Sequence, residues 1–205
     1  MKIYSVNDNE FKQFGRVLNI DATEIINVAG LIEKVESGSK YLPSVEAFEQ
    51  LEIKERLQNE IFGQLPMQLG YCWGYNDTMN ALEWHTCSEV NVATEDLILL
   101  LGDRRDIEED NKYDSAKIKA FLLKKGEVIE VYATTMHFCP IHYKKENGFG
   151  CVVGLIKGTN TPLNNDEIKV KPLFSTNKWL IAHKENQGLI NRGVIGSIYG
   201  ENHKI

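Results

Sequence analysis

Gly126-Glu127-Val128-Ile129-Glu130-Val131-Tyr132-Ala133-Thr134-Thr135-Met136-His137 is a turn, a strand, a tighter turn and a histidine. An earlier segment reads Glu83-Trp84-His85-Thr86-Cys87-Ser88-Glu89. Side chains alternate along a strand, so Glu83 and His85 share one face. We expect a turn to return Glu89 to that face from the neighbouring antiparallel strand. An imidazole and two carboxylates would then converge, a mixed nitrogen and oxygen set that suits zinc, manganese, iron or nickel.

Short strand-like runs dominate the chain after Pro66 and indicate a β-sandwich or β-barrel. They cover residues 80–85, 97–101, 117–123, 128–132 and 150–156, and a later run covers 178–183. Residues 1–65 instead show helical spacing. The candidate helices follow Asp8, Asp21 and Pro43, and Asp21 with Glu24 resembles a capping box. We predict a single domain with a helical N-terminal region (1–65), a barrel (66–165) and a C-terminal strand and tail (166–205).

Composition excludes several classes of protein. The 205 residues carry a formal charge of −6, whereas proteins that hold nucleic acid through its phosphates are normally basic. The sequence lacks an apolar run near the roughly 20 residues of a membrane helix, and its polar start does not predict a secretory signal. The four cysteines form no C-x-x-C pair. We therefore expect a cytoplasmic protein with free thiols, without a nucleic-acid or membrane partner.

The segment around His85 resembles the first motif of the cupin superfamily, G-x5-H-x-H-x3–4-E-x6-G. His85 takes the second histidine place, Glu89 follows after three residues, and Glu83 replaces the first histidine. The closing glycine does not follow Glu89 at the usual distance, whereas Gly102 has that spacing from Glu95. Either Glu89 or Glu95 is the carboxylate ligand, and the tight spacing from His85 favours Glu89.

The segment from Gly126 to His137 resembles the second cupin motif, G-x5-P-x-G-x2-H-x3-N. Tyr132 takes the proline place and Thr134 the second glycine place, while Ile141 stands where the asparagine is usual. Residues 66–165 also resemble an uncharacterised family of bacterial cupin-like proteins. The resemblance implies a mainly β fold, a cupin-type (double-stranded β-helix or jelly-roll) barrel.

The resemblance also implies a divalent metal ion held by His85, Glu89 and His137, with Glu83 either a further ligand or the catalytic base. An opening lined by Trp84, Tyr132, Lys178 and His183 is expected to bind the substrate. Cupins with mixed histidine and glutamate sites include sugar isomerases, which implies aldose–ketose or uronate isomerisation through an enediol. The alternatives are a metal-dependent lyase or hydrolase of a small carboxylated metabolite, and a non-catalytic ligand-binding barrel. Cupin barrels commonly pair through an edge strand, so a homodimer is expected.

Overall fold

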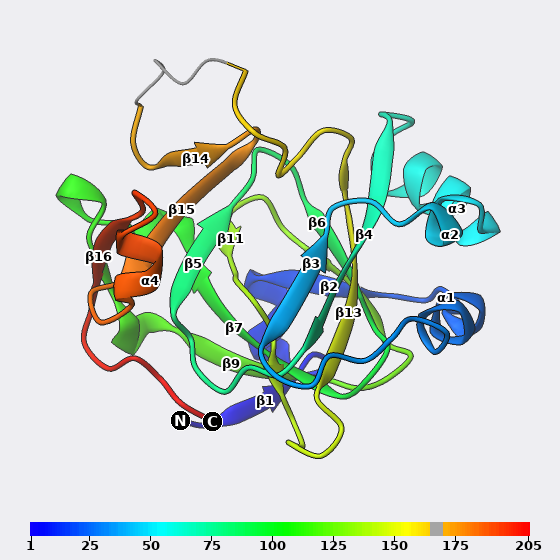
Figure 1. Ribbon diagram of the computed structural model, residues 1–205, viewed down its shortest axis with the longest axis horizontal. Helices are drawn as coiled ribbons and strands as arrows, with labels where there is room; N and C mark the ends of the chain where they lie inside the picture. Colours follow the sequence, from blue (N-terminus) through cyan, green and yellow to red (C-terminus); the bar gives the residue numbers. More distant parts are fainter. Residues whose placement is uncertain (165–169) are drawn as a thin grey trace.

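The computed structural model describes residues 1–164 and 170–205. Most regular elements are strands, which form three sheets (Figure 1). The first sheet contains β1 (Ile3–Ser5), β7 (Leu97–Asp103), β9 (Lys119–Leu123), β11 (Thr135–Met136) and β12 (Ile141–His142). The second, in spatial order, contains β2 (Gly15–Leu18), β10 (Val128–Val131), β6 (Glu89–Ala93), β13 (Phe149–Ile156), β4 (Met67–Gly74) and β3 (Ser39–Leu42). The third contains β5 (Ala81–Trp84), β8 (Tyr113–Asp114), β14 (Leu173–Ser175), β15 (Lys178–His183) and β16 (Ile195–Tyr199).

The helices are short and lie outside the sheets. The α-helices are α1 (Thr23–Ala29), α2 (Glu46–Glu49), α3 (Glu52–Glu60) and α4 (Gln187–Ile190). Single 3₁₀ turns are η1 (Asn9–Gln13), η2 (Arg104–Asp106), η3 (Glu109–Asn111) and η4 (Ser115–Lys117). In Figure 1, α1, α2 and α3 gather on one side, beside β3 and β4, while α4 lies with β15 and β16 on the other. No helix of the described residues is both long and apolar enough to cross a membrane.

The interior of the barrel is filled from the facing sides of the first two sheets. Leu99 of β7 and Phe121 of β9 pack with Ile129 of β10 and Val153 of β13. The alternate residues of β7, including Ile98, are buried on the opposite face of that strand, against the third sheet. A strand that is covered on both sides has no polar face, which explains the continuous apolar run at 97–101.

The N-terminal helices cover the outer face of the second sheet. Phe48 of α2 and Leu57 of α3 are fully buried against outward residues of β4 and β6, such as Leu69 and Val90. Burying side chains of this size contributes about 1.5–3 kcal/mol each. The prediction of a mainly β fold with α-helices in the N-terminal region is confirmed.

Two local predictions need correction. The expected helix after Asp8 is a 3₁₀ turn followed by β2, which pairs antiparallel with β10. Pairing with a distant strand therefore overrides the local helical spacing. The predicted hairpin between the strands of His85 and Glu89 is also absent, because β5 pairs with β15 whereas β6 pairs with β10 and β13.

Candidate metal centre

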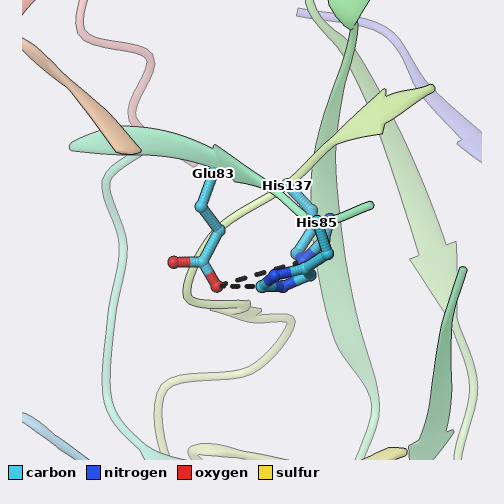
Figure 2. A group of neighbouring side chains, drawn as sticks. All are labelled: Glu83, His85 and His137. Atoms are coloured by element: carbon cyan, nitrogen blue, oxygen red, sulfur yellow. Dashed lines mark ion pairs between the residues drawn. The ribbon is translucent and has the colours of Figure 1, made fainter. Parts of the chain in front are cut away.

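A backbone bridge places Glu83 beside His137. The Glu83 N–H donates to the His137 carbonyl oxygen at 2.6 Å, and the His137 N–H donates to the Glu83 carbonyl oxygen at 3.0 Å. Residues directly opposite in an antiparallel pair project their side chains to the same side. His85 joins that side because it lies two positions after Glu83. Figure 2 shows the Glu83 carboxylate directed at the two imidazole rings.

Glu89 reaches the same point from β6, a strand of another sheet. Its Oε2 atom lies 3.5 Å from His85 Nε2 and 3.1 Å from His137 Nε2. Glu83 Oε1 lies 4.0 Å from the same two nitrogens. The structure therefore brings together Glu83, His85, Glu89 and His137, hereafter the His/Glu cluster. Glu95, the alternative carboxylate, instead forms an ion pair with Lys125 at 3.2 Å.

His85 is held with one nitrogen facing the cluster. Its ring is fully buried, and Nδ1 lies 2.7 Å from the carbonyl oxygen of Asn177. A carbonyl oxygen only accepts hydrogen bonds, so we assign the imidazole proton to Nδ1. His85 Nε2 is then a free lone pair directed at the carboxylates, and it has no hydrogen-bond partner. A histidine oriented through its other nitrogen in this way is typical of metal ligands.

Glu89 is an ionised carboxylate in a buried place. Its Oε1 accepts a hydrogen bond from Asn91 Nδ2 at 2.8 Å. Burial disfavours the charge, but the adjacent imidazole of His137 outweighs burial and holds the pKa of Glu89 well below its usual range. Burial likewise disfavours a charged His137, yet the Glu89 carboxylate raises the pKa of His137. The two residues therefore form an ion pair, and a metal ion that bound both of them would displace the proton of His137.

The cluster fits a divalent cation. Two ligand atoms each about 2.1 Å from one ion are roughly 3.0 Å apart in octahedral and roughly 3.4 Å apart in tetrahedral geometry. The separations of 3.1 and 3.5 Å from Glu89 to the histidines match these values. Glu83 also offers an oxygen, because donor atoms of Glu83, His85 and His137 all lie within 4.8 Å of one another. The donor set suits a borderline ion such as zinc, manganese, iron or nickel.

A cavity of about 280 Å³ adjoins the cluster. Glu83, Glu89 and His137 form its polar wall, and Leu99 and Val153 belong to its apolar lining. Lys178 also lines the cavity, where its ammonium group forms an ion pair with Glu83 Oε2. The structure thus places Lys178, one of the predicted substrate-binding residues, within the site.

The other three predicted substrate-binding residues lie elsewhere. Trp84 points to the face opposite Glu83 and His85, and it packs in the core between the first and third sheets. His183 is fully buried, with its Nε2 3.3 Å from the carbonyl oxygen of Gly200. Tyr132 follows the end of β10, and its backbone N–H donates to Phe14. These residues do not line the cavity, which corrects their predicted position.

Several cavity residues were missed by sequence reasoning. Tyr41, Asn91 and Arg192 line the cavity, and Asn177 supports His85 from the turn between β14 and β15. Asn91 lies two residues after Glu89, so strand alternation alone places it on the same face. Asn177 has a left-handed φ of 54°, a conformation that asparagine tolerates, but its sequence does not reveal which histidine it meets.

Solved structures that resemble the chain do so distantly. They include vicilin from hazelnut (Corylus avellana), with a TM-score of 0.39 and 7% identity over 81% of this chain and 41% of that one. Oxalate decarboxylase from Bacillus subtilis gives 0.38 and 10% over 80% of this chain and 34% of that one. Salicylate 1,2-dioxygenase from Pseudoaminobacter salicylatoxidans gives 0.34 and 11% over 75% and 34%. The chain therefore spans less than half the length of these proteins.

The sequence comparisons identify a family without a described activity. No functionally curated protein matches the sequence. A family model described as "Domain of unknown function (DUF4867)" matches residues 3–203, nearly the whole chain. This agrees with the expected resemblance to an uncharacterised family. The chain therefore belongs to the DUF4867 family.

Proposed function

We propose that this protein is a metal-dependent enzyme that interconverts an aldose and a ketose, or the corresponding uronates, through an enediol. The observation that carries the proposal is the convergence of His85, Glu89 and His137 beside an additional carboxylate, Glu83, at the wall of a small cavity. Isomerisation needs both a place for a metal ion and a base that moves a proton between adjacent carbons.

His85, Glu89 and His137 would hold the ion, and Glu83 would be the base. A bound divalent ion would supply polarisation of two neighbouring substrate oxygens. Lys178 fixes one oxygen of Glu83, and the other oxygen faces the cluster. The Glu83 carboxylate lies on the cavity wall, within reach of a carbon-bound proton of a ligand in the cavity. A cavity of about 280 Å³ suits a small metabolite and not a polymer.

Elemental analysis of the purified protein tests the metal site. We expect stoichiometric metal in the wild type, and loss of metal in both His85→Ala and His137→Ala. His203→Ala is the matched control, because His203 lies outside the cluster and bonds the Ser115 carbonyl oxygen. Wild-type metal content in both cluster variants would overturn the proposed centre.

Proton exchange tests the reaction. The metal-loaded protein is incubated in deuterated water with a panel of aldoses, ketoses and uronates, and incorporation of deuterium at carbon is followed by NMR. We expect exchange with at least one member, and its loss in Glu83→Gln with metal retained. Loss of metal in Glu83→Gln would make Glu83 a ligand instead. Absence of exchange across the panel would contradict the isomerase assignment.

We further expect the protein to work in the cytoplasm, where its four free cysteines stay reduced. A homodimer remains our expectation for its assembly. The exposed strand β3 lies at an edge of the second sheet and is a place for such pairing. Analytical ultracentrifugation checks this expectation, and a monomer at micromolar concentration would contradict it.

A further inference from the structure

We infer that the cavity selects an anionic ligand, a small polyol with a terminal carboxylate or phosphate, and that Arg192 binds its charged end. This inference rests on the proposed function only in treating the ligand as a substrate. Arg192 follows α4 in the sequence and lines the same cavity as Glu83, Glu89 and His137.

Arg192 is positioned for recognition by contacts that leave its guanidinium edge available. Its Cζ atom lies 5.8 Å from the centre of the Phe174 ring, a cation–π contact with β14. It forms no ion pair with a carboxylate in residues 1–164 or 170–205. A guanidinium that is stacked on an aromatic ring keeps its planar fork of donors, which matches carboxylate and phosphate oxygens.

The charges of the cavity favour an anion once a metal ion is bound. Lys178 compensates Glu83 directly, and Glu89 and the exposed Arg192 are further charged residues that line the cavity. Lys40 also lines the cavity, but it pairs with Trp73 across β3 and β4, so its side chain shares the outer face of the sheet and its charge is not counted. The positive charge of a divalent cation would therefore be larger than the negative charge of Glu89, and with Arg192 it would leave the cavity with a net positive charge. The anionic end of a ligand would compensate this positive charge, which a neutral ligand would leave uncompensated.

Tyr41 adds a neutral donor to the cavity. It pairs with Cys72 across β3 and β4, and both residues line the cavity. Asn160 Nδ2 donates to the Tyr41 hydroxyl oxygen at 2.9 Å. The hydroxyl proton of Tyr41 is therefore free to donate to a ligand oxygen. Arg192 and Tyr41 are thus hydrogen-bond donors among the residues that line the cavity, whereas Glu83 and Glu89 are acceptors, so a ligand with an anionic end and hydroxyl groups can satisfy both kinds.

Calorimetric titration of the metal-loaded full chain tests this inference with three matched four-carbon probes. Erythronate carries a carboxylate, erythritol 4-phosphate carries a phosphate, and erythritol is neutral. We expect at least one anion to bind about tenfold or more tightly than erythritol, and Arg192→Gln to remove that preference. Arg192→Lys is expected to retain part of it. Arg56→Gln is the control, because Arg56 lies on α3 in an exposed ion pair with Glu60, and the change in net charge is the same.

The outcomes separate this inference from the proposed reaction. Equal binding of the three probes, no measurable binding of either anion, or an unchanged preference in a folded Arg192→Gln variant would overturn it. The identity of the tighter anion distinguishes a sugar acid from a sugar phosphate. Binding is measured without turnover, so an anion preference survives even if no proton exchange is found. Exchange with neutral sugars that is insensitive to Arg192→Gln would overturn this inference alone.

Discussion

Asn177→Gly is expected to weaken metal binding while leaving the fold in place. The Asn177 carbonyl oxygen accepts a hydrogen bond from His85 Nδ1, and the Asn177 side chain holds that carbonyl in place through hydrogen bonds of its own. Its Oδ1 accepts from the Thr86 backbone N–H at 3.0 Å and from the Thr86 hydroxyl at 2.6 Å, while its Nδ2 donates to Thr159 Oγ1 at 2.9 Å. Glycine tolerates the φ of 54° at this position but makes none of these side-chain bonds.

The magnitude follows from the support that His85 loses. Loss of a partner that orients a metal ligand typically costs about 10- to 100-fold in affinity, or about 1.4–2.7 kcal/mol. The lost side-chain hydrogen bonds, at about 0.5–1.5 kcal/mol each, would give a somewhat larger loss of stability. The bonds to Thr86 are exposed and glycine suits the backbone, so we expect a net loss of about 1–2 kcal/mol.

Competition with a chromogenic chelator measures the metal affinity, and thermal melting of the metal-free protein measures the stability. Asn111→Gly is the matched control, since Asn111 has a similar φ of 60° and lies in η3, outside the residues of the cluster. Wild-type metal affinity in Asn177→Gly would show that the Asn177 side chain is not needed to hold the carbonyl that orients His85, which would contradict this prediction.

Three further predictions concern charge and metal. Glu89→Gln should lower metal affinity by at least about 100-fold, because it keeps the shape but removes a buried ligand charge; Glu95→Gln should not, and chelator competition compares them. Hydrogen bonds from the Arg105 side chain hold the pKa of Asp103 below its usual range. The stability that Asp103 contributes is therefore present above about pH 4 and is lost as the pH falls through the lowered pKa. Asp103→Asn should lower the free energy of unfolding in urea by about 1–2 kcal/mol at pH 7, and by progressively less below pH 4. Removing the metal with EDTA should lower the free energy of unfolding by about 2.7 kcal/mol relative to the protein with metal at 100 times its Kd. The loss should reverse when the ion is added back, and a melting curve that EDTA leaves unchanged would contradict the metal centre.

The strands of the barrel were predictable because their cause is local. The strands β7, β9, β10, β13 and β15 appear within a few residues of the predicted runs. Their apolar and β-branched residues fit a sheet that is buried on one or both faces. Strand pairing was not predictable in the same way. The segment of β2 has helical spacing in isolation, and it becomes a strand only because β10 offers a free edge.

The core of the site was predictable for a similar reason. Glu83 and His85 share a face by alternation, and the resemblance supplied His137. The same rule of alternation argues against Trp84, which lies between Glu83 and His85 and must face the other way. It also places Lys178 and His183 on opposite faces of β15. Residues on one face of a strand are an even number of positions apart, and these two are five positions apart. The positions of Arg192 and Asn177 could not be predicted in this way, because both residues lie outside regular strands and their partners are distant in sequence.

The origin of the four side chains in the cluster has a consequence for stability. Glu83 and His85 come from the end of β5 in the third sheet, and Glu89 comes from β6 in the second. His137 follows β11 in the first sheet, so one ion would tie together three sheets. Separate sheets cannot present this donor set in an unfolded chain, and an ion that binds only the folded arrangement stabilises it by mass action. Before binding, the cluster holds buried polar atoms without partners, such as His85 Nε2. The same arrangement that costs stability in the metal-free protein therefore provides the driving force for taking up the ion.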